Sequence, residues 1–417
     1  MSYFHLDLLI SYFRNKKAKQ IIVLSISMVL NVILGFAISI STTRALGSVD
    51  YGKYSYLNNL FTLLPFFLTF GIYQSGQRLV ALNRYSESKK NFLGILLVFS
   101  IFISAAMIIL LFFYSFIDDT IYSNGNGFYI RIFAILIISY PLQFLLEAYL
   151  SGDNRMESLA LNRTMPKVLY LLLLSLALFH FFKLNIYYVV FFQYCAMIII
   201  YSVTIFKLRP AFGNLKYHRM LLEKQNRSYG FFEYLGSISD AATEKLSVFF
   251  ILFFLSSKEV GYWSLAYSVC APLSMISSVI GTSLYKNFAN QDRIPHKALV
   301  FTYSISVILL IGFLVFIKPF FTFFYTKDFF DVLSIIYLTG IAFTVKGIAI
   351  FYNKFISSHG HGKELFAAAV AVGIVNVLGF WYMTKWFNLK GAIYTLILSS
   401  CLYYILMVFI YLKKINK

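Results

Sequence analysis

The chain has 417 residues, of which 59% are hydrophobic and only 13% are charged. A soluble protein carries about 25% charged residues, so this composition excludes a soluble globular protein. The net charge is +19, which in a soluble chain would indicate a nucleic-acid partner. In a membrane protein Lys and Arg instead set the orientation in the bilayer, and we expect no nucleic-acid partner. The sequence therefore predicts an all-α polytopic membrane protein.

Twelve apolar stretches along the chain are long enough to cross a membrane, since a bilayer core takes about 20 helical residues. They lie at residues 21–43, 57–79, 92–116, 128–150, 164–182, 186–206, 229–255, 260–285, 298–317, 332–356, 365–384 and 391–412. The first stretch follows a basic segment and has no small-residue cleavage site, so we expect a retained span rather than a signal peptide. The sequence thus predicts about twelve transmembrane helices.

Lys and Arg are distributed unequally between the two sides of this topology. The two terminal segments and every second connection together carry 24 of them, whereas the remaining connections carry 8. The side richer in Lys and Arg faces the cytoplasm. We therefore expect both termini in the cytoplasm, which requires an even number of spans.

The longest connection, residues 207–228, is basic and divides the spans into two groups of six. We expect residues 1–206 to form an N-terminal six-helix bundle, the connection to form a cytoplasmic linker, and residues 229–417 to form a C-terminal six-helix bundle. A short repeat supports this division, because Leu46–Ser55 aligns with Leu255–Ser264 at an offset of 209 residues. An even number of spans per half predicts parallel repeats around a central cavity.

Charged residues inside the predicted spans are the main candidates for function, because a charge in the bilayer needs a partner or water. Span seven carries Glu233, Asp240 and Glu244 at a spacing that places them on one helical face, and these acids are candidates for ion coupling. Lys245 in the same span and Lys346 in span ten lie near mid-depth and are candidates for substrate contact. The alternative is that these charges only pair and hold helices together.

Two further cations, Arg44 and Arg78, lie near predicted helix ends, where a long side chain can reach the interface. The sequence has no Walker motif, no nucleophile elbow and no metal-ligand spacing. We therefore predict no catalytic residue, no metal and no cofactor, and a protein that is not an enzyme.

Five short segments spread along the chain combine aromatic and charged residues, four of them with glycine. They are Thr43–Tyr56, Gly71–Arg78, Glu244–Lys245 followed by Val260–Tyr267, Phe324–Phe329, and Phe387–Ala392. Together they resemble the O-antigen and polysaccharide repeat-unit flippases (Wzx-type), a polysaccharide transport family of the multidrug/oligosaccharidyl-lipid/polysaccharide (MOP) superfamily. The chain departs from the family pattern at Glu244–Lys245, where an Asp-Arg type pair is usual, and at Thr326, where Gly is usual.

The resemblance implies a MATE-like fold of two six-helix bundles around a central cavity. It implies a flippase of the bacterial inner membrane that moves undecaprenyl-pyrophosphate-linked oligosaccharide repeat units to the periplasmic leaflet by alternating access. The repeat unit would belong to an O-antigen (and so to lipopolysaccharide), a capsule or an exopolysaccharide. Lys245, Lys346, Arg78 and Arg44 would attract the anionic head group into the cavity. Membrane lipids, and the polymerase and chain-length proteins of the same pathway, would be the partners.

Two other functions are compatible with parts of the sequence. A multidrug or cation antiporter of the same superfamily would use the acids of span seven to bind a cationic substrate. An O-antigen polymerase-type membrane enzyme would need a large periplasmic loop with catalytic residues. No connection on the predicted outer side exceeds roughly 15 residues, which disfavours the enzyme.

Overall fold

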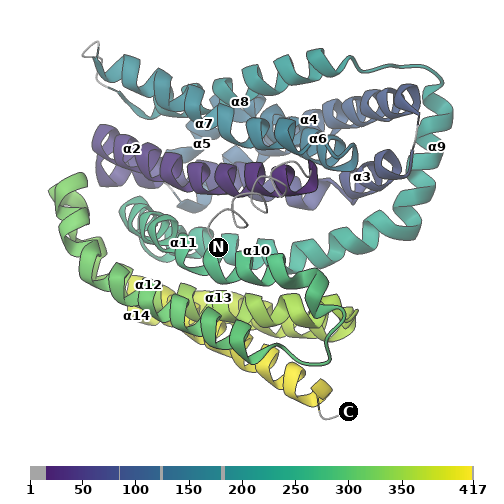
Figure 1. Cartoon of the computed structure of the whole chain (residues 1–417). Helices are drawn as coiled ribbons and strands as arrows, with labels where there is room; N and C mark the ends of the chain where they lie inside the picture. The colour runs from purple at the N-terminus through teal and green to yellow at the C-terminus, as the bar shows by residue number, and fades with distance from the viewer. Residues whose placement is uncertain (1–15, 84, 123–124, 180–183, 416–417) are drawn as a thin grey trace, which may run out of the picture. The chain divides into compact units, whose positions relative to one another are not determined.

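The computed structural model describes residues 16–415 except 84, 123–124 and 180–183; at some positions within the helices, 235–244 among them, it describes the backbone only. The described residues form helices joined by short turns, and they contain no strand. Figure 1 shows these helices along the chain.

The helices follow one another with short connections, as expected for a chain that crosses a membrane many times. Their bounds are α2 Lys16–Leu68, α3 Ile72–Leu82, α4 Ser86–Tyr122, α5 Asn126–Phe133, η1 Ala134–Ile138, α6 Ser139–Gly152, α7 Met156–Phe179, α8 Ile186–Leu208, α9 Leu215–Gln225, η2 Asn226–Gly230, α10 Phe231–Phe254, α11 Ser257–Phe288, α12 His296–Phe324, η3 Lys327–Val332, α13 Leu333–Ser358 and α14 Gly362–Ile415.

In the described part of the chain, 9 helical stretches are long and apolar enough to span a membrane. Helix α14 contains two predicted spans, joined at a kink at Asn388. Helix α2, kinked at Gly47, contains the first predicted span and the first part of the second, 57–79, whose remainder lies in α3. Helix α10 adds a shorter apolar stretch, Lys245–Phe254. These observations confirm the all-α membrane architecture with about twelve spans.

The described chain folds as two compact units. The first contains the chain up to Ser41 together with Phe61–Leu235, and the second contains Thr42–Leu60 together with Gly236–Lys417. The segment around the kink of α2 therefore packs with helices that come much later in the chain. The bundles 1–206 and 229–417, which follow chain order, stay a prediction.

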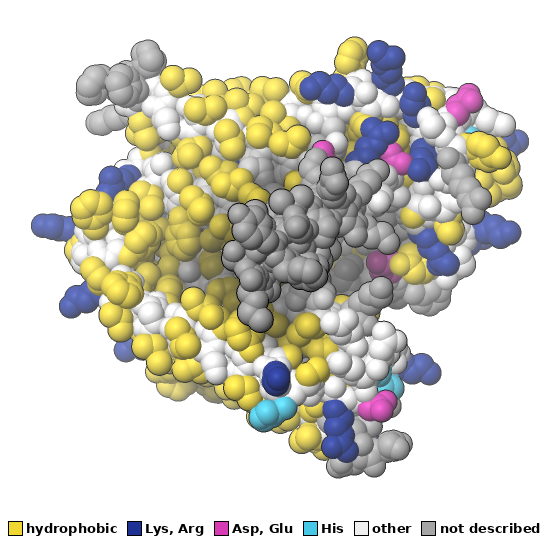
Figure 2. Space-filling model, in the orientation of Figure 1, with side chains coloured by type: hydrophobic (Ala, Val, Ile, Leu, Met, Phe, Trp, Pro, Cys, Tyr) yellow, Lys and Arg dark blue, Asp and Glu magenta, His cyan; other side chains and the backbone are white. Residues whose placement is uncertain are grey.

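In the first unit, the segment predicted as a cytoplasmic linker is fixed to the start of α4. The backbone N–H of Ala211 donates to the carbonyl oxygen of Lys90 at 3.0 Å, and that of Gly213 donates to the side-chain oxygen of Asn91 at 3.0 Å. In α9, the buried ring of His218 lies edge-on to Phe92, with centroids 4.9 Å apart. Figure 2 shows Lys and Arg gathered at the α9 end of this unit, whereas hydrophobic side chains cover much of the visible surface elsewhere.

In the first unit, the helix is interrupted between α2 and α3. Phe70 and Gly71 have positive φ angles of 44° and 80°, so the helix cannot continue and backbone carbonyls lose their helical partners. The side chain of Asn226 donates to the Phe70 carbonyl at 2.9 Å, and the hydroxyl of Tyr234 donates to the Phe67 carbonyl at 2.8 Å. The start of η2 and the first turn of α10 thus each supply a donor to a carbonyl near the break.

In the second unit, α13 packs against both α11 and α14 (Figure 1). The core at one end of these helices is aromatic and includes a chain of Tyr hydroxyls, in which Tyr303 lies 3.3 Å from Tyr352 and 2.6 Å from Tyr404. Each of these three Tyr hydroxyls has a hydrogen-bond partner, which offsets the cost of removing it from water.

The two repeated segments found in the sequence contact each other in the second unit. A Cβ atom built on Gly52 would lie only 1.6 Å from the carbonyl oxygen of Ser257, and one built on Gly261 would lie 2.7 Å from that of Ser48. At the offset of 209 residues Gly52 corresponds to Gly261 and Ser48 to Ser257. Each glycine therefore touches the serine that precedes the other glycine by four residues, as in a contact with two-fold symmetry. This reciprocal contact supports the repeat.

Candidate functional site

The two mid-depth lysines predicted from the sequence are part-buried in the second unit. Lys245 precedes Val248 and Leu252 by three and seven residues on α10, and both of these are buried. Lys346 lies on α13 three residues before the buried Ala349, and its Nζ is 6.0 Å from the centroid of the Phe343 ring. Residues at these spacings share a helical face, so both lysines point toward protein rather than toward lipid.

The acids predicted for ion coupling fall in two groups. Asp240 and Glu244 lie where only the backbone is described, so their side chains are outside the described structure. Glu233 is described and exposed, near the start of α10. Tyr229 forms a side-chain hydrogen bond with Glu233, and the guanidinium carbon of Arg78 lies 4.4 Å from the centroid of the Tyr229 ring.

The Arg78–Tyr229–Glu233 cluster therefore joins two residues for which the sequence suggested separate roles. A guanidinium above an aromatic face is attracted by the ring quadrupole, and the interaction stabilises by about 0.5–1 kcal/mol at an exposed site. The cluster lies beside the break between α2 and α3, and Arg78 projects from α3. It connects a cation of α3 with an acid of α10 within the first unit.

Arg44 has a local structural role that the sequence did not indicate. Its Nε donates to the carbonyl oxygen of Phe324 at 2.7 Å and its Nη2 donates to that of Phe323 at 3.1 Å. These carbonyls belong to the last turn of α12, where acceptors are free and the helix dipole favours a cation. Arg44 therefore caps α12, while its predicted place in the translocation cavity stays a prediction.

Sequence reasoning missed a further cation, Lys167. Lys167 falls near the start of the predicted span 164–182 and was counted with the cations of the cytoplasmic side. Helix α7 begins earlier, at Met156, so both Arg163 and Lys167 lie inside the helix. Lys167 follows the first residue of α7 by eleven residues and precedes Phe179 by twelve, or about 16 and 18 Å along the axis. A signal was present in the sequence: one helical face carries Arg163, Lys167, Tyr170 and Leu174. This spacing could have assigned Lys167 to the interior of a helix.

The environment of Lys167 is polar but contains no acid among the described residues. Its Nζ donates to the backbone carbonyl of Asn31 on α2 at 3.3 Å. The Asn31 side chain donates in turn to the Thr164 hydroxyl at 3.0 Å. Lys167 shares a face with the buried Tyr170 and Leu174, so it faces protein, and no described carboxylate forms an ion pair with it.

One turn away on the same helix, Arg163 is paired. Its Nη2 lies 3.2 Å from a carboxylate oxygen of Glu147 on α6, and the Gln143 amide donates to the other oxygen at 3.2 Å. The same face of α7 thus carries a neutralised cation and, at mid-helix, a cation held by a carbonyl. An anion is the ligand that the second arrangement attracts most strongly.

Comparison with known proteins identifies the family and the fold. The model of the polysaccharide biosynthesis protein family matches residues 18–289, more than half of the chain. A search of curated proteins gave no match.

Solved structures match almost the whole chain. A lipid II flippase MurJ in an inward closed conformation aligns with a TM-score of 0.73 at 16% identity, over 95% of this chain and 89% of that chain. An inward-facing multidrug resistance MATE family transporter of the MOP superfamily aligns with a TM-score of 0.70 at 13% identity, over 95% of this chain and 99% of that one.

A MOP superfamily transporter from Pyrococcus furiosus, described as having a binding pocket of reverse polarity, aligns with a TM-score of 0.55 at 11% identity, over 97% of this chain and 98% of that one. At such identities these likenesses establish the fold, which is that of MOP superfamily transporters and flippases. The protein is a multi-pass membrane protein. From the match over residues 18–289, the chain belongs to the polysaccharide biosynthesis protein family.

Proposed function

We propose that this protein is a flippase that moves undecaprenyl-pyrophosphate-linked oligosaccharide repeat units from the cytoplasmic to the periplasmic leaflet of a bacterial inner membrane by alternating access. The repeat unit would belong to an O-antigen, a capsule or an exopolysaccharide. The head group of such a substrate is anionic and its glycan is polar, so its path through the membrane requires cations that face away from lipid. The lipid tail stays in the bilayer.

The observation that carries the proposal is Lys167. A Lys at the centre of a membrane helix costs about 2.5–3.5 kcal/mol on insertion scales. A hydrogen bond to a charged group contributes about 1.5–3 kcal/mol, so the Asn31 carbonyl only about offsets the cost. Water or an anionic ligand would stabilise the cation further. A pyrophosphate is an anionic ligand of this kind, because its oxygens accept several charge-assisted hydrogen bonds.

Lys245 and Lys346 belong to the same proposal as the cations of the second unit. Their faces turn toward protein, and a rocking motion of the two repeats would offer such side chains to the substrate in turn. Glu233, with Asp240 and Glu244, would couple transport to an ion. Arg78 would attract the head group near the cytoplasmic mouth.

The multidrug or cation antiporter is the second candidate, because the fold is shared with MATE transporters and because span seven carries three acids. An organic cation would be repelled by Lys167, which has no acidic partner among the described residues. The two functions therefore differ in the sign of the substrate charge. They also differ in the outcome of deleting the protein.

A deletion strain tests the proposal. We expect the loss of surface polysaccharide and the accumulation of lipid-linked repeat units on the cytoplasmic leaflet, measured by the access of a membrane-impermeant sugar-oxidising reagent to intact spheroplasts. Normal polysaccharide together with accumulation of cationic dyes would instead identify the antiporter. Single repeat units on the surface without long chains would identify a polymerase.

A further inference from the structure

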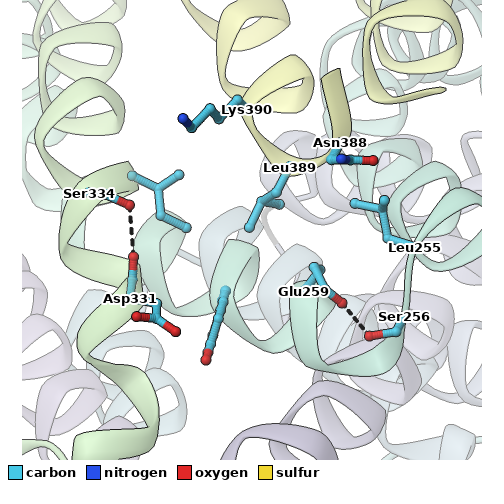
Figure 3. Close-up of a pocket in the computed structure, with 10 residues that line it drawn as sticks. Leu255, Ser256, Glu259, Asp331, Ser334, Asn388, Leu389 and Lys390 are labelled. Carbon is cyan, nitrogen blue, oxygen red and sulfur yellow. Dashed lines mark hydrogen bonds between the residues drawn. The ribbon is translucent and has the colours of Figure 1, made fainter. Parts of the chain in front are cut away.

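A pocket of about 510 Å³ opens on the second unit where three connections meet. They are the turn between α10 and α11, the segment of η3 that enters α13, and the kink of α14 (Figure 3). In the predicted topology all three lie on the side poor in Lys and Arg, the outer side. The volume is in the range of about 300–1,000 Å³ that is usual for small-molecule sites.

Some polar groups of this pocket already have partners. Ser256 caps α11 by accepting from the N–H of Lys258, and its hydroxyl bonds the carboxylate of Glu259. Figure 3 shows Glu259 turned toward Ser256. The Ser256 hydroxyl donates to the Glu259 carboxylate, so Glu259 already has a hydrogen-bond partner. The Tyr262 hydroxyl likewise donates to the carbonyl of Asp328 at 2.7 Å.

Three other side chains of the pocket make no hydrogen bond or ion pair with any described residue: Asp331, Asn388 and Lys390. They come from two different connections and present an acceptor-only group, an amide that both donates and accepts, and a donor-only group. Leu255, together with Ile335 and Leu389, supplies apolar surface between them. The pocket thus offers complementary hydrogen-bonding groups around an apolar wall.

The charges of the pocket select the kind of ligand. A cation would meet Lys390, and Lys258, outside the lining, has its Nζ 5.3 Å from the centroid of the lining Tyr262 ring. An anion would meet Asp331 and Glu259. A neutral ligand with several hydroxyl groups can donate to the carboxylate and accept from the ammonium and the amide at once, while its C–H surface lies on the leucines.

The backbone of Asn388 gives a second, independent indication. Its φ of 54° and ψ of −142° fall in a region that glycine adopts readily and that costs another residue about 1–3 kcal/mol. The kink does use glycine nearby, since a Cβ atom on Gly391 would lie 1.9 Å from the Met383 carbonyl oxygen. Asparagine at the strained position therefore supplies an amide to the pocket at a cost in stability.

We infer that this pocket binds a neutral saccharide residue at the outer side of the protein, through Asp331, Asn388 and Lys390. The saccharide could come from either of two sources. One is the glycan of the transported lipid, and for this source the inference rests on the proposed function and deepens it. The other source is a saccharide that is already free or polymerised on the outer side. Both present the same hydroxyl-bearing ring.

The experiment measures the binding of three small probes to the purified full-length protein by saturation-transfer NMR. The probes are methyl glucoside, glucuronate and glucosamine, which are neutral, anionic and cationic at pH 7. We expect the neutral probe to bind about fivefold more tightly than either charged one, given the mixed charges of the pocket. Tighter binding of a charged probe, or no binding of the neutral one, would overturn the inference.

Two variants and their matched controls locate the site. Asp331→Asn and Lys390→Gln should weaken binding of the neutral probe about threefold or more, whereas Asp328→Asn and Lys385→Gln, which change exposed charges on the same two elements outside the pocket, should not. Equal effects in variants and controls would contradict the assignment.

Asn388→Gly gives a signature that a structural role would not produce. The glycine relieves the strained backbone and should leave the thermal midpoint unchanged or higher, while probe binding falls about threefold, because the amide is lost. A lower midpoint with unchanged binding would show that Asn388 serves the kink alone.

The source of the saccharide is settled in proteoliposomes. If it is the transported glycan, Asp331→Asn and Lys390→Gln should slow translocation of a lipid-linked oligosaccharide. If it is a free or polymerised saccharide, translocation should stay normal while probe binding is lost. Wild-type protein that binds the neutral probe but moves no lipid-linked oligosaccharide would refute the proposed function and leave the pocket standing.

Discussion

Two helix contacts, one in each unit, solve the problem of packing in a membrane in opposite ways. In the second unit, Gly52 and Gly261 let two backbones touch, and the nearest atoms are backbone atoms of Ser257 and Ser48. In the first unit, α2 and α7 meet through Asn31, Thr164 and Lys167. Small residues permit close approach between membrane helices, whereas polar side chains there are expensive and mark function. The first contact should therefore respond to side-chain size and the second to charge.

The largest effect should follow from filling the glycine contact. In Gly52→Ala the new methyl would lie 1.6 Å from the Ser257 carbonyl oxygen, and because backbone cannot move aside cheaply, we expect a loss of about 3 kcal/mol or more. Membrane abundance and the thermal midpoint should both fall strongly. Gly35→Ala is the matched control on the same helix, since a Cβ atom there would meet nothing within 4 Å. Equal stability of the two variants would contradict the claim that the glycine contact is sensitive to side-chain size.

Changing the charge at the polar contact should instead reduce transport while the fold remains. Lys167→Ala removes the cation and its cost of insertion, so we expect normal abundance and an export rate lower by about tenfold, the effect of losing one charge-assisted contact. Lys167→Arg should retain part of the export. Surface polysaccharide and protein abundance are measured together in a complemented deletion strain. Normal export by the Lys167→Ala variant would contradict the claim that the charge of Lys167 serves transport.

Arg163 sharpens this prediction, because it sits on the same face but has an acid partner. Arg163→Ala leaves Glu147 without its ion-pair partner and should lower the thermal midpoint, by an amount that corresponds to about 1 kcal/mol for a part-exposed pair. The double variant Arg163→Ala/Glu147→Gln should recover stability. A failure of the double variant to recover would mean that the pair is not the cause.

Replacing either lysine of the second unit should lower export less than replacing Lys167, because two lysines share the proposed contact with the head group. We expect Lys245→Ala and Lys346→Ala to leave abundance normal and to lower export about threefold each. If either lysine only pairs with an acid, its Ala variant should lose abundance instead. Removal of Asp240 or Glu244 in the same chain would then restore it.

The smallest effect should come from Arg44, which caps α12. Arg44→Ala removes two hydrogen bonds to carbonyls at the helix end and should cost about 1 kcal/mol at this exposed site. The reduced midpoint of thermal unfolding, with export per molecule unchanged, is the expected result. Lower export at normal stability would instead place Arg44 in the translocation path.

The architecture was predictable because apolar length and the distribution of Lys and Arg are strong, local signals. The repeat around Gly52 was also visible in the sequence, whereas the predicted span 57–79 is interrupted at Phe70 and Gly71. Lys167 was counted with the cytoplasmic cations at the start of the predicted span 164–182, because the first turns of α7 are polar. A hydropathy pattern cannot distinguish a polar helix face that contacts protein from a loop. The cap formed by Arg44 was missed because its partners lie about 280 residues away along the chain.

The central claim is that an anionic, lipid-linked saccharide uses cations such as Lys167 to cross the membrane. The most direct test is translocation in proteoliposomes that contain the wild-type protein, with an undecaprenyl-pyrophosphate-linked oligosaccharide as substrate and a cationic dye as competitor. We predict translocation by the wild-type protein, loss of most of it in Lys167→Ala, and no effect of the dye. Translocation of the dye, with no movement of the lipid-linked oligosaccharide, would contradict the account.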